Sequence, residues 1–162
     1  TNRSSFFRGE VDKYGWVDMG SSFLPSEIIA AFLWAQLENL EKIQKKRKEI
    51  WENYFINLKA WADKNEIGLP ILPEYATNNA HMFYLICKDL NQRTKLIEHL
   101  KDKEILAVFH YISLHKSPFY SSKYQGKPLL ETDRFTDTLV RLPLFYELNF
   151  DKVIDVLVKS EL

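Results

Sequence analysis

The sequence predicts an α/β sandwich in which a few strands are covered on one side by helices, with a long helix leading into the domain. Residues 25–65 contain no glycine and a single proline at the first position, and their apolar residues recur at steps of three and four. Beyond this stretch, short runs rich in aromatic and β-branched residues alternate with amphipathic stretches. This alternation of helical and strand patterns is typical of sheets covered by helices.

The helix predicted over residues 25–65 is too long for one small domain. At about 1.5 Å per residue it would extend roughly 60 Å, whereas a compact chain of this size has a radius of gyration of about 15 Å. Residues 28–37 are apolar nearly all round, residues 38–49 are mostly charged and residues 50–62 are amphipathic. We therefore interpret it as a connecting helix, buried at both ends and solvated in the middle. A coiled coil is disfavoured because the apolar spacing fails around Arg47.

The remaining elements follow in order along the chain. Glycine and proline end the long helix, and a short strand is possible directly afterwards, over residues 67–71. The further predicted strands are 81–87, 105–111 and 141–144, and the further predicted helices are 91–103, 132–140 and 150–158. The segment 112–131 is long and polar and is interrupted by proline and glycine, which is typical of a functional or mobile loop.

Composition excludes several classes of protein. Lysine plus arginine and aspartate plus glutamate number 22 each, and this balance argues against a dedicated nucleic-acid binder. The basic run 45–48 is flanked by acidic residues and is expected to be a solvated helix face. No apolar run approaches the roughly 18 residues of a membrane span, and no signal peptide is present, so we expect a cytoplasmic protein. The single cysteine, Cys87, lies in an apolar run and is expected to be an inert core thiol.

One group of residues is a candidate binding site. His110, Tyr111 and His115 follow directly from a predicted strand and open the long loop. Binding residues concentrate on loops held by a rigid scaffold, and two imidazoles and a phenol can donate hydrogen bonds to phosphate or sugar oxygens. The alternative is a pair of surface histidines with Tyr111 packed beneath them. No metal site is expected, because no third ligand lies nearby in the sequence.

A second candidate is the turn over residues 18–27, which leads into the long helix. Its serine hydroxyls and the free N–H groups of the helix start are able to hold an anion such as phosphate. The alternative is simple N-capping of the helix by Ser22 or Ser26.

At these stretches the chain resembles the DegT/StrS-type sugar aminotransferases. The resemblance is carried by FFRGEVDKYGWVDMGSSFLPSEIIAAFLWAQLE, NAHMFYL, AVFHYISLH and RLPLFY, in this order along nearly the whole chain. Within the family, the GSSFLPSE turn is most similar to the dTDP-4-oxo-6-deoxyglucose transaminases, which make dTDP-4-amino-4,6-dideoxygalactose for surface polysaccharide. Most of the family carries Asn-Tyr-Arg at this turn, where this chain has Ser22, Phe23 and Leu24.

The resemblance implies the fold and the activity of a larger enzyme. Family members are pyridoxal-phosphate enzymes of the aspartate-aminotransferase fold (fold type I), which transfer an amino group to a nucleotide-linked keto sugar. On this basis residues 1–24 are the end of the large cofactor-binding domain, 25–65 a connecting helix and 66–162 the complete small C-terminal domain. The chain also opens without methionine on a polar run. It is therefore expected to be the C-terminal part of the enzyme and inactive alone.

The resemblance also implies roles for single residues and partners. Ser22 is expected to contact the cofactor phosphate of the neighbouring subunit in a homodimer, and His110, Tyr111 and His115 to hold the nucleotide-sugar. The catalytic Schiff-base lysine is expected to lie outside this chain, and glutamate is the expected amino donor. Neither a metal, a nucleic acid nor a membrane is implied as a partner. The alternative function is a non-catalytic, sugar-responsive binding or regulatory module derived from the same family.

Overall fold

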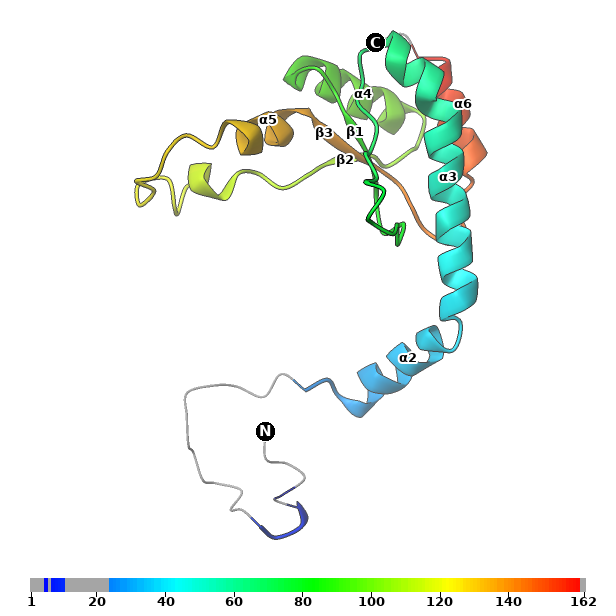
Figure 1. Ribbon diagram of the computed structural model, residues 1–162, viewed down its shortest axis with the longest axis vertical. Helices are drawn as coiled ribbons and strands as arrows, with labels where there is room; N and C mark the ends of the chain where they lie inside the picture. Colours follow the sequence, from blue (N-terminus) through cyan, green and yellow to red (C-terminus); the bar gives the residue numbers. More distant parts are fainter. Residues whose placement is uncertain (1–4, 6, 11–23, 161–162) are drawn as a thin grey trace. The chain divides into compact units, whose positions relative to one another are not determined.

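The computed structural model describes residues 5, 7–10 and 24–160. The chain divides into two compact units, Thr1–Leu40 and Glu41–Leu162, and Figure 1 labels their helices and strands. In the first unit, helix α2 (Glu27–Leu37) is capped by the Oγ atom of Ser26, which accepts a hydrogen bond from the Ile29 N–H at 3.3 Å. Every side chain of α2 is exposed, including Phe32 and Trp34. Ser26 therefore has the capping role that the sequence allowed.

The prediction of one unbroken helix over residues 25–65 is wrong. Helix α2 ends at Leu37 and α3 (Leu40–Lys64) begins after a two-residue turn. The Asn39 side-chain amide donates to the Ala35 carbonyl at 3.1 Å, and this is the bond that the Asn39 backbone N–H would make in a continuing helix. That N–H instead donates to the Gln36 carbonyl at 3.1 Å. The helix is therefore interrupted where the Asn39 backbone N–H bonds three residues back instead of four.

The sheet of the second unit has three antiparallel strands. They are β1 (Phe83–Ile86), β2 (Val108–Phe109) and β3 (Leu139–Leu142), in the order β1-β3-β2. The possible strand over residues 67–71 is reduced to a single bridge between Gly68 and Ile86. Strand β3 begins two residues earlier than predicted. The reason is the alternation of burial over these residues, which has the period of a strand. Val140 and Leu142 are buried, whereas Leu139 and Arg141 are half-buried.

Helices α3, α4 (Leu90–Asp102) and α6 (Phe150–Val158) join one face of this sheet in a single core. The register pairs Phe83 with Leu142 and Leu85 with Val140, which places these four buried residues on the same face. The Phe83 ring packs against Trp51 and Tyr54 of α3, with ring centroids 5.4 and 5.1 Å apart. In Figure 1, α6 runs beside α3, where the Trp61 Nε1–H donates to Ser160 Oγ at 3.2 Å.

The predicted α/β class is confirmed, since helices and a small sheet share one core. Cys87 is buried in this core as expected, and its burial raises the pKa of the thiol to about 12. Among the described helices, none is both long enough and apolar enough to cross a bilayer.

Candidate functional site

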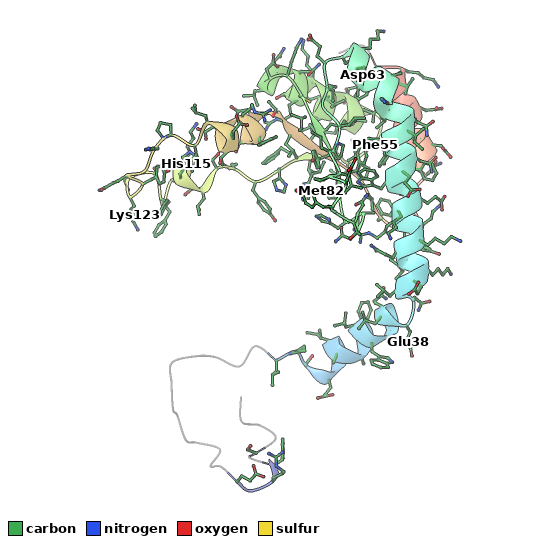
Figure 2. The ribbon with its side chains drawn as sticks, viewed as in Figure 1. Glu38, Phe55, Asp63, Met82, His115 and Lys123 are labelled. Atoms are coloured by element: carbon green, nitrogen blue, oxygen red, sulfur yellow. The ribbon has the colours of Figure 1, made fainter. Side chains whose placement is uncertain are left out.

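The predicted site residues lie where β2 gives way to the long loop. Strand β2 ends at Phe109, His110 and Tyr111 follow at once, and His115 lies in a short 3-10 helix, η1 (Leu114–Lys116). The loop continues to α5 (Leu130–Thr138), whose residues return beneath η1. Figure 2 shows His115 and Lys123 in this part of the chain. The loop is therefore anchored at one end by the sheet and at the other by α5.

Asp133 of α5 organises the start of this loop. Its Oδ1 atom accepts a hydrogen bond from Ser113 Oγ at 3.1 Å and also lies 3.1 Å from His115 Nε2, and its Oδ2 atom lies 2.8 Å from Lys116 Nζ. The Lys116 ammonium, followed by the Ser113 hydroxyl and the charge of His115, holds the pKa of Asp133 below its ordinary value, against the opposing effect of desolvation. Asp133 is thus an ionised acceptor that ties three loop residues to α5.

A pair of hydroxyls extends this network. Ser113 is buried, and its Oγ lies 2.7 Å from the Thr136 Oγ1 atom. An ionised carboxylate only accepts hydrogen bonds, so the Ser113 proton must point to Asp133. Thr136 then donates either to Ser113 or to the Thr132 carbonyl, which is 2.9 Å away. The loop start is therefore fixed by consistent donors and acceptors rather than by apolar packing alone.

The same argument assigns the proton on His115. Because its Nε2 atom lies 3.1 Å from an ionised oxygen of Asp133, a hydrogen on Nε2 is favoured over a lone pair that the carboxylate would repel. The side chain is only 10% exposed, and its ring also packs on Tyr124, with the centroids 5.3 Å apart. Tyr124 is held in turn by a hydrogen bond from its hydroxyl to the Lys127 carbonyl at 2.7 Å. Within the described residues Nδ1 of His115 has no hydrogen-bond partner; this atom accepts when the ring is neutral, with its hydrogen on Nε2, and donates when the ring is charged.

His110 and Tyr111 form a separate pair. Their ring centroids are 4.9 Å apart in an edge-on arrangement. Tyr111 is 78% exposed, whereas His110 is half-buried and its Nδ1 atom is buried without a hydrogen-bond partner. The arrangement differs from the alternative of surface histidines over a packed tyrosine, because it is the tyrosine that is exposed. In the described part of the chain, no hydrogen bond or ring contact joins this pair to His115.

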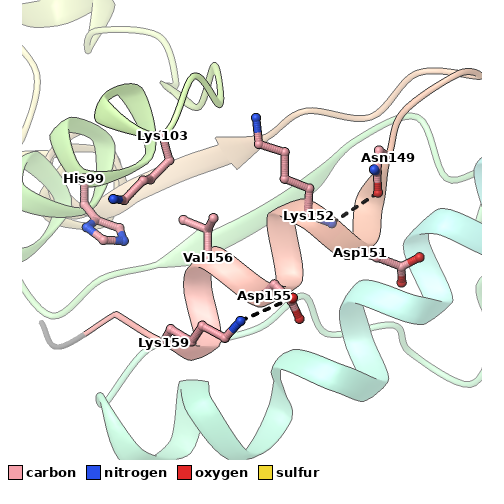
Figure 3. A pocket seen from close by; sticks show the side chains of 8 residues that line it. All are labelled: His99, Lys103, Asn149, Asp151, Lys152, Asp155, Val156 and Lys159. Carbon is pink, nitrogen blue, oxygen red and sulfur yellow. Dashed lines mark hydrogen bonds and ion pairs between the residues drawn. The ribbon is translucent and has the colours of Figure 1, made fainter.

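Other candidate features give no site. Ser22 lies outside the described residues. Among those described, no group of three or more histidine, cysteine, aspartate or glutamate side chains is placed to hold a metal ion. A shallow pocket lies between α4 and α6 (Figure 3). Its His99 has a buried Nε2 atom without a partner among the described residues, and the Lys159 ammonium that also lines the pocket is paired with Asp155 at 3.4 Å. None of the predicted site residues lines this pocket.

Sequence reasoning missed Asp133 and Arg141. Asp133 is 18 positions from His115, and only the return of α5 brings the two together. One available signal was the polar spacing of Asp133 and Thr136, three residues apart on a helix and therefore on one face. Arg141 carries a further signal, since an arginine in a strand that alternates with buried residues must face the opposite side of the sheet.

The fold has counterparts among solved structures and in one protein family. A solved aminotransferase of the DegT DnrJ EryC1 StrS type from Brucella abortus superimposes with a TM-score of 0.76 at 25% identity, over 96% of this chain and 41% of that one. The family model described as the DegT/DnrJ/EryC1/StrS aminotransferase family matches residues 3–160. The chain therefore belongs to this family, and the resemblance drawn from the sequence is confirmed.

Two curated relatives agree with this assignment. The chain is 27% identical to the GDP-perosamine synthase of Escherichia coli O157:H7 over 157 residues, covering 94% of this chain and 41% of that protein. It is 24% identical to the UDP-4-amino-4,6-dideoxy-N-acetyl-beta-L-altrosamine transaminase of Helicobacter pylori, covering 93% of this chain and 39% of that protein. The chain thus spans about two fifths of the length of these relatives.

Proposed function

We propose that these 162 residues are the C-terminal part of a pyridoxal-phosphate-dependent aminotransferase that acts on a nucleotide-linked 4-keto-6-deoxy sugar. The observation that carries the proposal is the family match over residues 3–160. The names of two relatives refer to GDP- and UDP-linked amino sugars, and this supports the proposed substrate class. The proposal also includes a dTDP-linked substrate, glutamate as the amino donor and a role in surface polysaccharide synthesis in the cytoplasm.

The proposed roles of the loop residues follow from their free atoms. His115 offers its Nδ1 atom, because Asp133 engages Nε2. Tyr111 offers an exposed phenol and His110 a buried Nδ1 atom without a partner. Imidazole and phenol groups bind hydroxyl and phosphate oxygens through hydrogen bonds. We assign all three residues to holding the nucleotide-sugar, and Asp133 to positioning His115.

The described residues do not include a lysine suited to hold the cofactor covalently. Pyridoxal phosphate, when bound, supplies the electron sink for amino transfer and is held through a lysine amine. Every described lysine is exposed except Lys46, which is half-buried and pairs with Glu49 at 2.7 Å. We therefore propose that the Schiff-base lysine lies in a part of the protein outside these residues. In this proposal Ser22 contacts the neighbouring subunit's cofactor phosphate in a homodimer.

The domain boundaries belong to the same proposal. Residues 1–24 would close the large domain, residues 25–65 would connect the domains and residues 66–162 would form the small domain. The connection consists of α2 and α3 with their intervening turn. The exposed apolar side chains of α2 support this arrangement, because large apolar patches are rare on free protein surfaces.

The test uses the longest protein that contains this sequence. We expect His110→Ala and His115→Ala to lower kcat/KM for the keto sugar by about tenfold to a hundredfold, since a hydrogen bond to a charged group is worth about 1.5–3 kcal/mol. The amino-donor half-reaction, followed by cofactor absorbance in single-turnover mixing, should lose less. Tyr75→Ala, at an exposed position remote in sequence, is the control. Sugar half-reactions within twofold of wild type for both variants would refute the assigned role.

A second experiment separates the enzyme from the regulatory alternative. The alternative is a non-catalytic, sugar-responsive module derived from the same family. The 162-residue chain is incubated with pyridoxal phosphate and dialysed, and we expect it to remain colourless and inactive. The longer protein should retain one chromophore per subunit and transaminate. Sugar-nucleotide binding by the longer protein without a retained chromophore would favour the module.

A further inference from the structure

Arg141 lies in the middle of the sheet and faces away from the core. It occupies the central strand β3, where its register partners are Tyr84 of β1 and Val108 of β2. The neighbouring residues Val140 and Leu142 are buried in the core. Because side chains alternate along a strand, Arg141 belongs to the opposite face of the sheet, together with Tyr84 and Val108.

The guanidinium of Arg141 has no polar partner within the described residues. The other arginines described there all have one. Arg134 binds Glu131 through two nitrogens, and the remaining partners are Glu10 for Arg8, Ala80 O for Arg47 and Thr136 O for Arg93. Arg141 is half-buried, and its Nε atom is buried without a hydrogen bond, whereas its terminal nitrogens are not fully buried. Arginine stays charged in proteins, so this charge lacks a counter-ion.

The surroundings of Arg141 offer further donors. The centre of its guanidinium lies 6.0 Å from the centroid of the Tyr111 ring, and the Tyr111 ring contacts His110. The His110 Nδ1 atom is also buried and without a partner. A buried polar group that lacks a hydrogen bond costs free energy. Two such groups beside one exposed tyrosine are therefore able to bind a ligand that supplies the missing partner.

We propose that Arg141, with Tyr111 and His110, forms a binding site for an oxyanion of a small-molecule substrate. The planar guanidinium fork matches carboxylate and phosphate oxygens in two-point contacts. If the proposed function holds, two substrates supply such a group: the carboxylate of the amino donor and the diphosphate of the nucleotide-sugar. Arg141 would then contact the ligand from the sheet, in addition to the contacts proposed for the loop residues.

The first test measures binding without any cofactor or turnover. The 162-residue chain, labelled with ¹⁵N at its arginine side chains, is titrated at low salt with glutarate or with inorganic pyrophosphate. The Nε resonance that is absent in Arg141→Lys should shift with one of the probes in the millimolar range. Arg141→Gln should weaken that probe by about tenfold or more, since a charge-assisted hydrogen bond is lost. Arg134→Gln, at an exposed arginine paired with Glu131, is the matched control and should change the affinity less than twofold.

The outcomes answer two separate questions: whether Arg141 binds an oxyanion, and whether that oxyanion is a carboxylate or a phosphate. A shift with glutarate alone identifies a carboxylate site, and a shift with pyrophosphate alone identifies a phosphate site. No shift of the Arg141 resonance with either probe overturns the proposal, as does equal weakening by Arg134→Gln. If Arg141→Gln loses its fold by circular dichroism, the wild-type Nε shift decides alone. The binding test does not depend on transamination. If the probe binds but the longer protein proves not to be an aminotransferase, only the proposed function is refuted. An active longer enzyme whose KM values are unmoved by Arg141→Lys would refute only this site.

Discussion

The Nε2 atom of His115 lies 3.1 Å from the Oδ1 atom of Asp133, and this contact ties the 3-10 helix η1 to helix α5. The carboxylate also holds Lys116 and Ser113, so one side chain of α5 fixes three residues of the loop. If the proposed binding role of His115 holds, its attachment to a rigid helix preorganises the loop for a ligand. The predictions below begin with this contact.

Removing the charge of Asp133 should release the His115 ring. An asparagine in its place can present either a carbonyl oxygen or an amide N–H, so it no longer requires a hydrogen on Nε2. We expect Asp133→Asn to raise the population of the tautomer protonated at Nδ1, as measured from the imidazole ¹⁵N shifts of His115 near neutral pH. Asp137→Asn, at an exposed aspartate of the same helix, should leave these shifts in place. Identical spectra for Asp133→Asn and wild type would contradict the tautomer assignment.

Asp133 should also contribute to the pH dependence of stability. Lys116, Ser113 and His115 lower the pKa of this carboxyl in the folded chain, relative to the unfolded chain. A lowered folded pKa stabilises the fold above the unfolded pKa, and this contribution disappears as the pH falls through the folded value. Urea midpoints of wild type and Asp133→Asn should therefore differ at neutral pH and converge below the ordinary aspartate range. A difference that persists unchanged in acid would assign the effect to packing.

The aromatic centre of the core should be sensitive to truncation. Phe83 is fully buried and contacts Trp51 and Tyr54. Phe83→Ala removes these contacts and leaves a cavity, so we expect the free energy of unfolding to fall by about 3–5 kcal/mol. Tyr75→Ala, at a side chain that is 91% exposed, should change it by less than about 0.5 kcal/mol. Denaturant unfolding measures both, and similar losses for the two variants would be inconsistent with this core.

Cys87 should be unreactive in the folded chain. The thiolate is the reactive form, and burial raises the pKa of this thiol to about 12. We expect no reaction with a disulfide reagent at pH 8 until denaturant unfolds the chain. A cysteine introduced at the exposed neighbouring position, as Lys88→Cys in a Cys87→Ala background, should react at once and serves as the control. Rapid labelling of native Cys87 would show that the strand end opens.

The loop tip should depend on Gly126. A Cβ atom at this position would lie 2.5 Å from the Tyr124 hydroxyl oxygen, which is too close for any real contact. Gly126→Ala therefore forces the ring to move and breaks the hydrogen bond from that hydroxyl to the Lys127 carbonyl. Because Tyr124 packs on His115, we expect the ring protons of His115 to shift in NMR spectra. Ser122→Ala, at an exposed loop position, should leave them unshifted.

Much of the fold was readable from the sequence, because it depends on local periodicity. The helical spacing of Trp51, Tyr54 and Leu58 predicted the face of α3 that is buried. The apolar runs predicted the strands around Phe83 and Val108, and the position of Cys87 in such a run predicted its burial. The family was also readable, since its motifs follow one another along the chain.

Tertiary structure decided the features that depend on residues far apart in sequence or on competing hydrogen bonds. Helix α2 ended where periodicity predicted it to continue, at a turn in which the Asn39 backbone N–H bonds to the Gln36 carbonyl. Asp133 became the partner of His115 only through the return of α5. Arg141 has no counter-ion among the described residues because strand pairing places it opposite the core, between Tyr84 and Val108. Periodicity determines which face of an element is buried, whereas the packing of distant elements determines which polar atoms meet and which remain free.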